Sequence, residues 1–236
     1  TVAKGMNTLV IDDLCFVLKP SVRRKTLQIT VERNGDLLLF APPNTEEQSL
    51  RLFVNEKRFW IYSKLAEKER LQKVVATKTF VDGEGFLYLG RSYRLKLVDT
   101  QDVPIKLLNG RFMLQRSRVK EGRSQLIYWY STRAKVWLWK VIKDYMARME
   151  VQPVGVKVQD LGYRWGSCGK GDWLYFHWKT ILLPPRIVEY VIVHELAHLH
   201  QPHHTPEFWQ RVERAMPDYE PRKIWLAEHG MDVEGI

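Results

Sequence analysis

The sequence is poor in cysteine, with only Cys15 and Cys168 among its 236 residues. Two cysteines cannot build the disulfide framework of a small secreted domain, so we expect a reducing compartment and predict a cytoplasmic protein. Long apolar runs are also missing. No stretch approaches the roughly 18–20 residues that a membrane-spanning helix needs, so we expect no membrane association. Asp12 and Asp13 interrupt the apolar stretch near the start, and no small-residue cleavage site of a signal peptide follows.

Acidic residues are scarce in the first two thirds of the chain. Residues 1–150 hold 28 Lys and Arg against 16 Asp and Glu, whereas residues 151–236 hold 9 against 11. This basic excess favours an acidic partner such as nucleic acid. The candidate surface comprises Arg111, Arg116, Arg118, Lys120, Arg123, Arg133, Lys135, Lys140 and Lys143. Alternation would place Arg116 and Arg118 on one strand face that meets phosphates, although such a run more often forms a solvated charged face.

The first 122 residues carry the pattern of β-hairpins. Apolar and polar residues alternate over short segments, and the dipeptides Asn34-Gly35 and Asn109-Gly110 favour two-residue hairpin turns. Between the first two hairpin segments, apolar residues recur at helical spacing over residues 50–65. The sequence therefore predicts an N-terminal β-rich domain over residues 1–122, a twisted antiparallel sheet with one inserted helix. No internal repeat is visible.

The pattern changes near Gly122. Apolar side chains over residues 127–149 fall on one broad helical face, which Pro153 ends. Strands and a glycine-rich loop are predicted over residues 154–183, and Pro184-Pro185 then opens another helix. We therefore predict a second domain over residues 123–236 and an α+β fold class.

The helix predicted to open at Pro184-Pro185 contains His194-Glu195-Leu196-Ala197-His198. Histidines four residues apart lie one turn apart on the same helix face, so both imidazoles can bind one cation. Glu195 projects about 100° round from His194, which suits a carboxylate that acts on water beside the metal and is not itself a ligand. A surface helix that carries these residues by chance is the alternative interpretation.

A catalytic zinc site takes three protein ligands and keeps one position open for water. His200 lies on the opposite side of the helix from His198 and is a poor third ligand, whereas His203 and His204 both follow the helix end. His204 comes ten residues after His194, as in the metzincin pattern His-Glu-x-x-His-x-x-Gly-x-x-His, but Gln201 replaces the glycine of that pattern. Spacing favours His204 and leaves His203 as the alternative.

Several motifs together resemble the YgjP-like metallopeptidase family, whose members are known as predicted metal-dependent hydrolases. They are Arg164-Trp165-Gly166-Ser167-Cys168, Trp178-Lys179-Thr180, Leu182-Leu183-Pro184-Pro185, Tyr190-Val191-Ile192-Val193-His194-Glu195-Leu196-Ala197-His198 and His204-Thr205-Pro206-Glu207-Phe208-Trp209. Upstream residues such as Trp60 and Gly90 also fit, so the resemblance covers nearly the whole chain. It departs from the usual family pattern mildly, at His203 and Thr205.

The resemblance implies a zincin-like catalytic half, similar to the SprT-like and minigluzincin groups. One Zn²⁺ would be bound by His194, His198 and His204. Glu195 would act as the general base in the hydrolysis of protein or peptide substrates. The resemblance also places the segment from Arg164 at the edge of the cleft, beside a strand with Trp178 along which an extended substrate would bind. The candidate substrate-binding residues are Arg164, Trp165, Cys168, His177 and Trp178.

Several alternatives accompany this prediction. A Cys168 thiolate is a conceivable zinc ligand, and so is Glu207, whose more ordinary role is to complement the dipole of the next helix. A zinc-dependent hydrolase of a non-peptide bond would use the same three histidines. A DNA-associated protease or binding module of SprT-like type would use the basic half to hold nucleic acid. Three protein ligands, where a structural zinc site takes four, favour catalysis.

Overall fold

The computed structural model describes residues 8–32, 35–71, 77–162 and 164–236. They belong to two compact units, residues 1–74 and residues 75–236. Within the described ranges, no helix combines the length and the apolar character that crossing a membrane requires.

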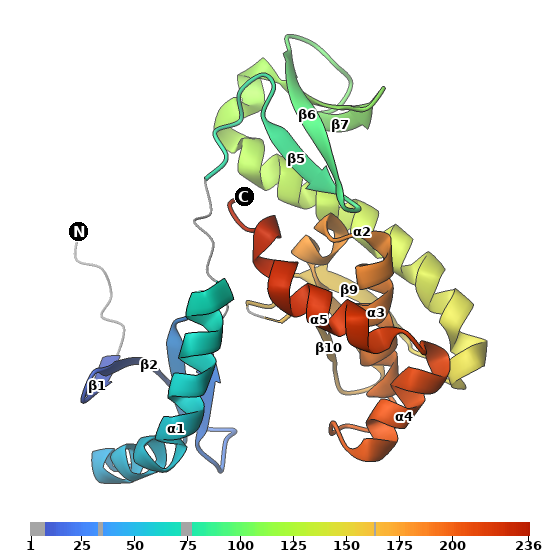
Figure 1. The fold of residues 1–236 in the computed structure, drawn as a ribbon. Coiled ribbons are helices and arrows are strands. Elements are labelled where there is room, and N and C mark those ends of the chain that lie inside the picture. The colour runs from blue at the N-terminus through green and yellow to red at the C-terminus, as the bar shows by residue number, and fades with distance from the viewer. Residues whose placement is uncertain (1–7, 33–34, 72–76, 163) are drawn as a thin grey trace. The chain divides into compact units, whose positions relative to one another are not determined.

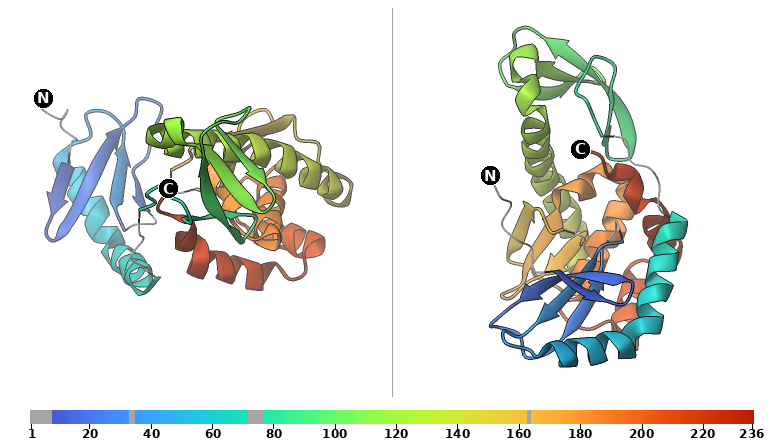
Figure 2. Two further views of the ribbon diagram at one scale, coloured as in Figure 1. Left: turned by 90° about the horizontal axis from the view of Figure 1, so that it is seen from above. Right: turned by 90° about the vertical axis from the view of Figure 1, so that its left-hand side faces the viewer.

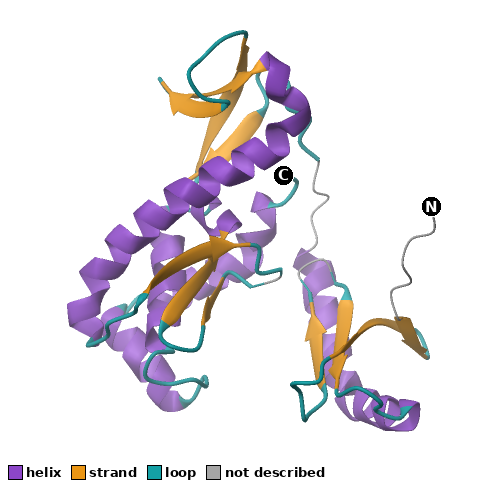
Figure 3. Cartoon of the chain, turned by 180° about the vertical axis from the view of Figure 1, so that it is seen from behind, coloured by secondary structure: helices purple, strands orange, loops and turns teal. Residues whose placement is uncertain are grey.

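The first unit is a four-stranded sheet with one long helix, α1 (Glu47–Leu71), packed on it (Figure 3). Its strands, in order across the sheet, are β1 (Thr8–Ile11), β2 (Leu14–Pro20), β4 (Leu37–Ala41) and β3 (Gln28–Val31). The inner strands β2 and β4 run parallel, and the outer strands pair antiparallel with them. Leu50, Val54 and Ile61 of α1 share a core with Phe16 and Leu39 of the sheet. The periodic apolar residues of the helix thus lie where a helix-period pattern predicts.

The second unit begins with a sheet of the same design. Its strands, in order across the sheet, are β5 (Gly85–Tyr88), β6 (Arg91–Val98), β8 (Arg111–Gln115) and β7 (Ile105–Leu108). Again the inner strands are parallel and the outer pairs are antiparallel. A short 3-10 helix η1 (Arg116–Glu121) and the long helix α2 (Gly122–Met149) follow. The chain therefore contains the arrangement of four strands and a helix twice, a structural repeat that is not visible in its sequence.

The α+β class is confirmed, and the β3–β4 and β7–β8 pairs confirm two predicted hairpins. Asn109 and Gly110 both have positive φ, 49° and 73°, as a type I′ turn requires. Asn34 of the other turn lies outside the described residues. The single antiparallel sheet predicted over residues 1–122 is wrong, because two separate sheets form and each has a parallel inner pair. A hairpin is encoded by its turn and its alternation, whereas the docking of one hairpin beside another depends on residues far apart in sequence.

The expected boundary at residues 122 and 123 falls at the start of α2, inside the second unit. The β5–β6 turn ties the sheet before this boundary to the segment that precedes α3. The Leu89 N–H donates to the carbonyl of Ile181 at 2.8 Å and the Gly90 N–H to that of Leu182 at 3.1 Å. A Cβ on Gly90, whose φ is 74°, would lie 2.8 Å from the Cα of Pro184, so this turn needs glycine to dock.

Helix α2 then connects this sheet to the rest of the unit, as Figures 1 and 2 show. It contacts a three-stranded sheet in the order β10 (Gly166–Cys168), β11 (Trp173–His177) and β9 (Gly155–Gln159). The remaining elements are η2 (Trp178–Leu182), α3 (Pro185–Ala197), α4 (Pro206–Ala215), α5 (Tyr219–His229) and η3 (Gly230–Val233). Pro185 starts α3 at its first position, and the helix is buried along most of its length. It lies beside β10, an edge strand of the small sheet.

Candidate metal centre

Helix α3 and the loop after it bring three histidines together. The side chains of His194, His198 and His204 each offer one ring nitrogen, and these atoms lie within 4.8 Å of one another. The Nε2 atoms of His194 and His204 are 3.0 Å apart. Among the described residues, these three form the one group of side chains that could hold a metal ion, and neither His203 nor Glu207 belongs to it.

The turn after α3 brings His204 back to the helix without a glycine. The N–H groups of His200 and Gln201 both donate to the carbonyl of Ala197, so the helix closes with a tightened last turn. Gln201 is not among the residues with positive φ, and the glycine of the metzincin pattern is therefore not needed here. The ring Nε2 of His200 lies 3.2 and 3.1 Å from the carbonyl oxygens of Met149 and Glu150, so His200 binds the end of α2.

The protonation of these imidazoles suits a metal ion. The Nδ1 of His198 donates to the Gln201 carbonyl at 3.0 Å, so in the neutral ring the Nε2 is the nitrogen that could bind a metal ion. Burial, and then the neighbouring His198 and His204, lowers the pKa of His194 to about 3. Burial also lowers the pKa of His204. The buried Nδ1 of His194 has no hydrogen-bond partner within the described structure. Three imidazoles that converge fit a zinc ion.

Aromatic rings surround the three histidines. Phe208 of α4 lies 5.0 Å from His194, 4.6 Å from His198 and 4.8 Å from His204, measured between ring centroids. Trp209 stacks on His204, and Tyr190 meets His194 edge-on. These rings exclude water from one side of the group, which strengthens electrostatic interactions there.

Glu195 follows the first of the three histidines and is turned toward the strand β10. The residue is buried, with 6% exposed, and burial raises its pKa to about 8. The backbone N–H of Cys168, and then the charge of Arg164, act in the opposite direction and lower that pKa. The carboxylate therefore has one backbone donor from β10 and no place among the metal-binding side chains.

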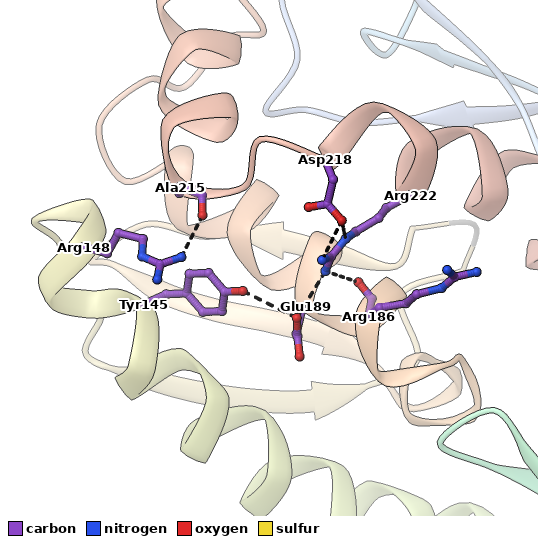
Figure 4. Close-up of polar contacts among 7 residues, drawn as sticks. All are labelled: Tyr145, Arg148, Arg186, Glu189, Ala215, Asp218 and Arg222. Atoms are coloured by element: carbon purple, nitrogen blue, oxygen red, sulfur yellow. Dashed lines mark hydrogen bonds and ion pairs between the residues drawn. The ribbon is translucent and has the colours of Figure 1, made fainter.

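A polar network joins the helices α2, α3, α4 and α5 (Figure 4). Arg222 of α5 binds Asp218 through two nitrogens, at 2.9 and 2.8 Å, and Glu189 of α3 at 3.1 Å. Glu189 also accepts from the hydroxyl of Tyr145 in α2 at 3.5 Å. Arg148 of α2 donates to the carbonyl of Ala215 at the end of α4, at 3.0 Å. Elements that are far apart in sequence are thus tied to the helix that carries two of the histidines.

The structure separates the five predicted substrate-binding residues. Arg164 and Cys168 lie near Glu195, and Trp165 packs against Gly230 on the C-terminal side. His177 and Trp178 are buried, with only 2% and 3% exposed. His177 accepts from the Lys179 N–H, and Trp178 stacks on Tyr130 in the core.

The structure also shows residues that the sequence interpretation missed. Tyr219 and Lys223 lie one turn apart on α5, and both contact the indole of Trp209. Gly166 lies against Glu195. The spacing of Tyr219 and Lys223 could have predicted that they lie on the same face of a helix, since residues four apart do so. Nothing local in the sequence connects Gly166 to Glu195.

Three comparisons with known proteins bear on this site. The family model described as YgjP-like, metallopeptidase domain, matches residues 25–229. Among solved structures, the chain is similar to the metallopeptidase zymogen abylysin of Pyrococcus abyssi, with 21% identity, 37% of this chain and 91% of that chain covered, and a TM-score of 0.35. A comparison with curated proteins finds no match.

Proposed function

The chain belongs to the YgjP-like metallopeptidase family, and from that premise we propose that it is a zinc-dependent peptidase with Glu195 as its general base. The observation that carries the proposal is the group of His194, His198 and His204 with a buried carboxylate at the residue after the first histidine. Three histidine ligands leave one position of a tetrahedral ion open, which is typical of a catalytic site. These histidines would hold a zinc ion, which would supply a water with a pKa lowered to about 7 and would polarise the substrate carbonyl.

The surroundings of Glu195 support a role in proton transfer. The Cys168 N–H holds the carboxylate, and the remaining lone pairs are free to accept a proton from water and pass it to the leaving amine. A pKa of about 8 describes the metal-free protein, and a nearby cation favours the charged carboxylate. The residue therefore acts as a base when the ion is present.

The edge of β10 is the place we propose for the substrate main chain. The expected strand beside Trp178 cannot serve, because Trp178 lies in η2 and β11 is the central strand of its sheet. The His177 N–H donates to the carbonyl of Trp165, and the Gly169 N–H to that of Trp173. By the alternation of an antiparallel pair, the N–H and C=O groups of Gly166 and Cys168 then point away from β11. An extended peptide would pair with the N–H and C=O of Gly166 and with the C=O of Cys168, since the Cys168 N–H already donates to Glu195.

The proposal is tested by metal analysis and a peptide-cleavage assay on the full chain. We expect one zinc per chain and cleavage of an unstructured protein substrate. Glu195→Gln should keep the zinc and lose on the order of 100-fold or more in kcat, as expected when a general base is removed. His194→Ala should lose both zinc and activity. Equal activity in His194→Ala and the parent would overturn the proposal. Glu195→Gln that loses ester hydrolysis but keeps peptide cleavage would point to the non-peptide alternative.

We also propose a nucleic-acid partner, through the basic residues of the second unit. Arg116 and Arg118 do not share a strand face, because both lie in η1, where they pair with Asp99 and Glu121. The support comes instead from β6 and β8, where Arg94 and Arg111 are register partners and both are exposed. A salt-dependent binding isotherm with duplex or single-stranded DNA tests this, and binding that is absent or independent of salt overturns it. The cytoplasmic location remains a prediction, supported by two cysteines that are both free thiols.

A further inference from the structure

Gly166 of β10 lies directly against the side chain of Glu195. A Cβ at position 166 would come within 2.6 Å of Cγ, 2.7 Å of Oε1 and 2.8 Å of Cδ of that glutamate. Non-bonded heavy atoms in well-packed proteins do not approach so closely, since carbon atoms in contact lie about 3.5–4.0 Å apart. Any residue larger than glycine would therefore displace either the strand or the carboxylate.

Position 166 requires glycine because a side chain would clash with Glu195, and not because the backbone adopts a conformation that only glycine favours. Gly166 does not have the positive φ that marks Gly162 and Gly171 nearby, so alanine can adopt its backbone conformation. It also pairs in register with Phe176 of β11, as an ordinary strand residue does. What alanine cannot do at this position is avoid Glu195.

Glu195 has little room to move away. The residue is 6% exposed, and the next two residues of the helix, Leu196 and Ala197, are fully buried. The strand, in contrast, has three residues and pairs on one side only. A methyl group at position 166 would push β10 and Glu195 apart and would break the hydrogen bond from the Cys168 N–H to the carboxylate.

We propose that Gly166 is a positioning residue that seats the Glu195 carboxylate against the edge of β10. The missing side chain lets the strand approach until the Cys168 N–H can donate to Glu195, and it brings the carboxylate to the strand edge proposed for the substrate. The inference rests on the proposed role of Glu195 as general base, but the contact itself can be tested without catalysis.

The test is a double-mutant cycle in thermal unfolding of the full chain without metal. Gly166→Ala should lower the Tm by roughly 2–10 °C, the range expected when an overpacked methyl group destabilises a domain of this size. Glu195→Ala removes all three clashing atoms, so Gly166→Ala should cost little in that background. An equal loss of Tm in both backgrounds overturns the proposal. If Gly166→Ala does not fold, recovery of folded protein in the double variant supports the proposal, and failure of both variants overturns it.

Gly169→Ala is the matched control. A Cβ there would lie 2.5 Å from Cε2 of Tyr175, so this variant is equally crowded but away from Glu195. Its loss of Tm should be the same in the parent and in the Glu195→Ala background. If the loss of Tm in Gly169→Ala vanished in the Glu195→Ala background, the cycle would not be specific to the contact of Gly166 with Glu195, and the proposal would be overturned.

Kinetic measurements with zinc separate the positioning role of Gly166 from the catalytic role of Glu195. With zinc, Gly166→Ala should keep the zinc affinity of the parent and lose on the order of 100-fold in kcat, as expected of a displaced catalytic group. Unchanged kcat in Gly166→Ala, with Glu195→Gln inactive, overturns the positioning role. A fully active Glu195→Gln overturns the general-base proposal instead, and the unfolding cycle still decides whether the contact exists.

Discussion

The indole of Trp209 stacks on the imidazole of His204, with 5.7 Å between ring centroids and 23° between ring planes. Tyr219 stacks on the same indole from α5 at 5.5 Å, and the Nζ of Lys223 lies 4.2 Å from the ring centroid. His204 is the exposed member of the three histidines. Its ring is therefore held by side chains of α4 and α5, and not by the loop that carries it.

Trp209→Ala should weaken zinc binding by about 10–100-fold, as loss of a group that orients a metal ligand commonly does. Isothermal titration of the metal-free protein with Zn²⁺ gives the Kd. Trp225→Ala is the control, because Trp225 stacks on His229 at 4.6 Å and touches none of the three ligands. Equal zinc affinity in the Trp209→Ala and Trp225→Ala variants would contradict the orienting role.

Three neighbouring histidines should behave differently when each is replaced by alanine. His204→Ala should lose stoichiometric zinc, measured by metal analysis after dialysis, whereas His203→Ala should retain it. His200→Ala should also retain zinc but lower the free energy of unfolding by about 1 kcal/mol, since it removes contacts with the last carbonyls of α2. Zinc loss in His203→Ala with retention in His204→Ala would reverse the ligand assignment.

Zinc should stabilise the folded chain through its three ligands. At a free zinc concentration about 1,000 times Kd, the free energy of unfolding should rise by about 4 kcal/mol, provided that the unfolded chain does not bind the ion. A chelator should reverse the gain. His198→Ala should show little of it, and equal stabilisation of this variant and the parent would mean that zinc acts elsewhere.

Arg222→Met should destabilise the protein by about 1–3 kcal/mol, because it leaves Glu189 and Asp218 without their shared cation. Its side chain is 18% exposed, so the lost interactions are only partly replaced by water. Arg116→Met is a matched control, since the Arg116–Asp99 pair is 58% and 86% exposed and should contribute less than about 1 kcal/mol. Denaturant unfolding of both variants measures the free energy of unfolding. An equal loss in Arg222→Met and Arg116→Met would mean that the Arg222 network contributes no more than an exposed ion pair.

Much of the local structure followed from the sequence alone. The hairpin at Asn109-Gly110, the long helix over residues 127–149 and the pair His194 and His198 all depend on residues close together in the chain. Backbone periods of 2 and 3.6 residues determine which side chains share a face, so alternation and helical spacing were sufficient to predict them. The likeness to one family could also be identified from motifs.

Long-range packing decided the rest. The parallel pairing of β2 with β4 and of β6 with β8, and the burial of His177 and Trp178, depend on contacts between segments far apart in sequence. The contact of Gly166 with Glu195 joins positions 29 residues apart in the chain, and no local pattern anticipates it. Backbone periodicity determines which face a residue occupies, but only the assembled core determines what that face meets.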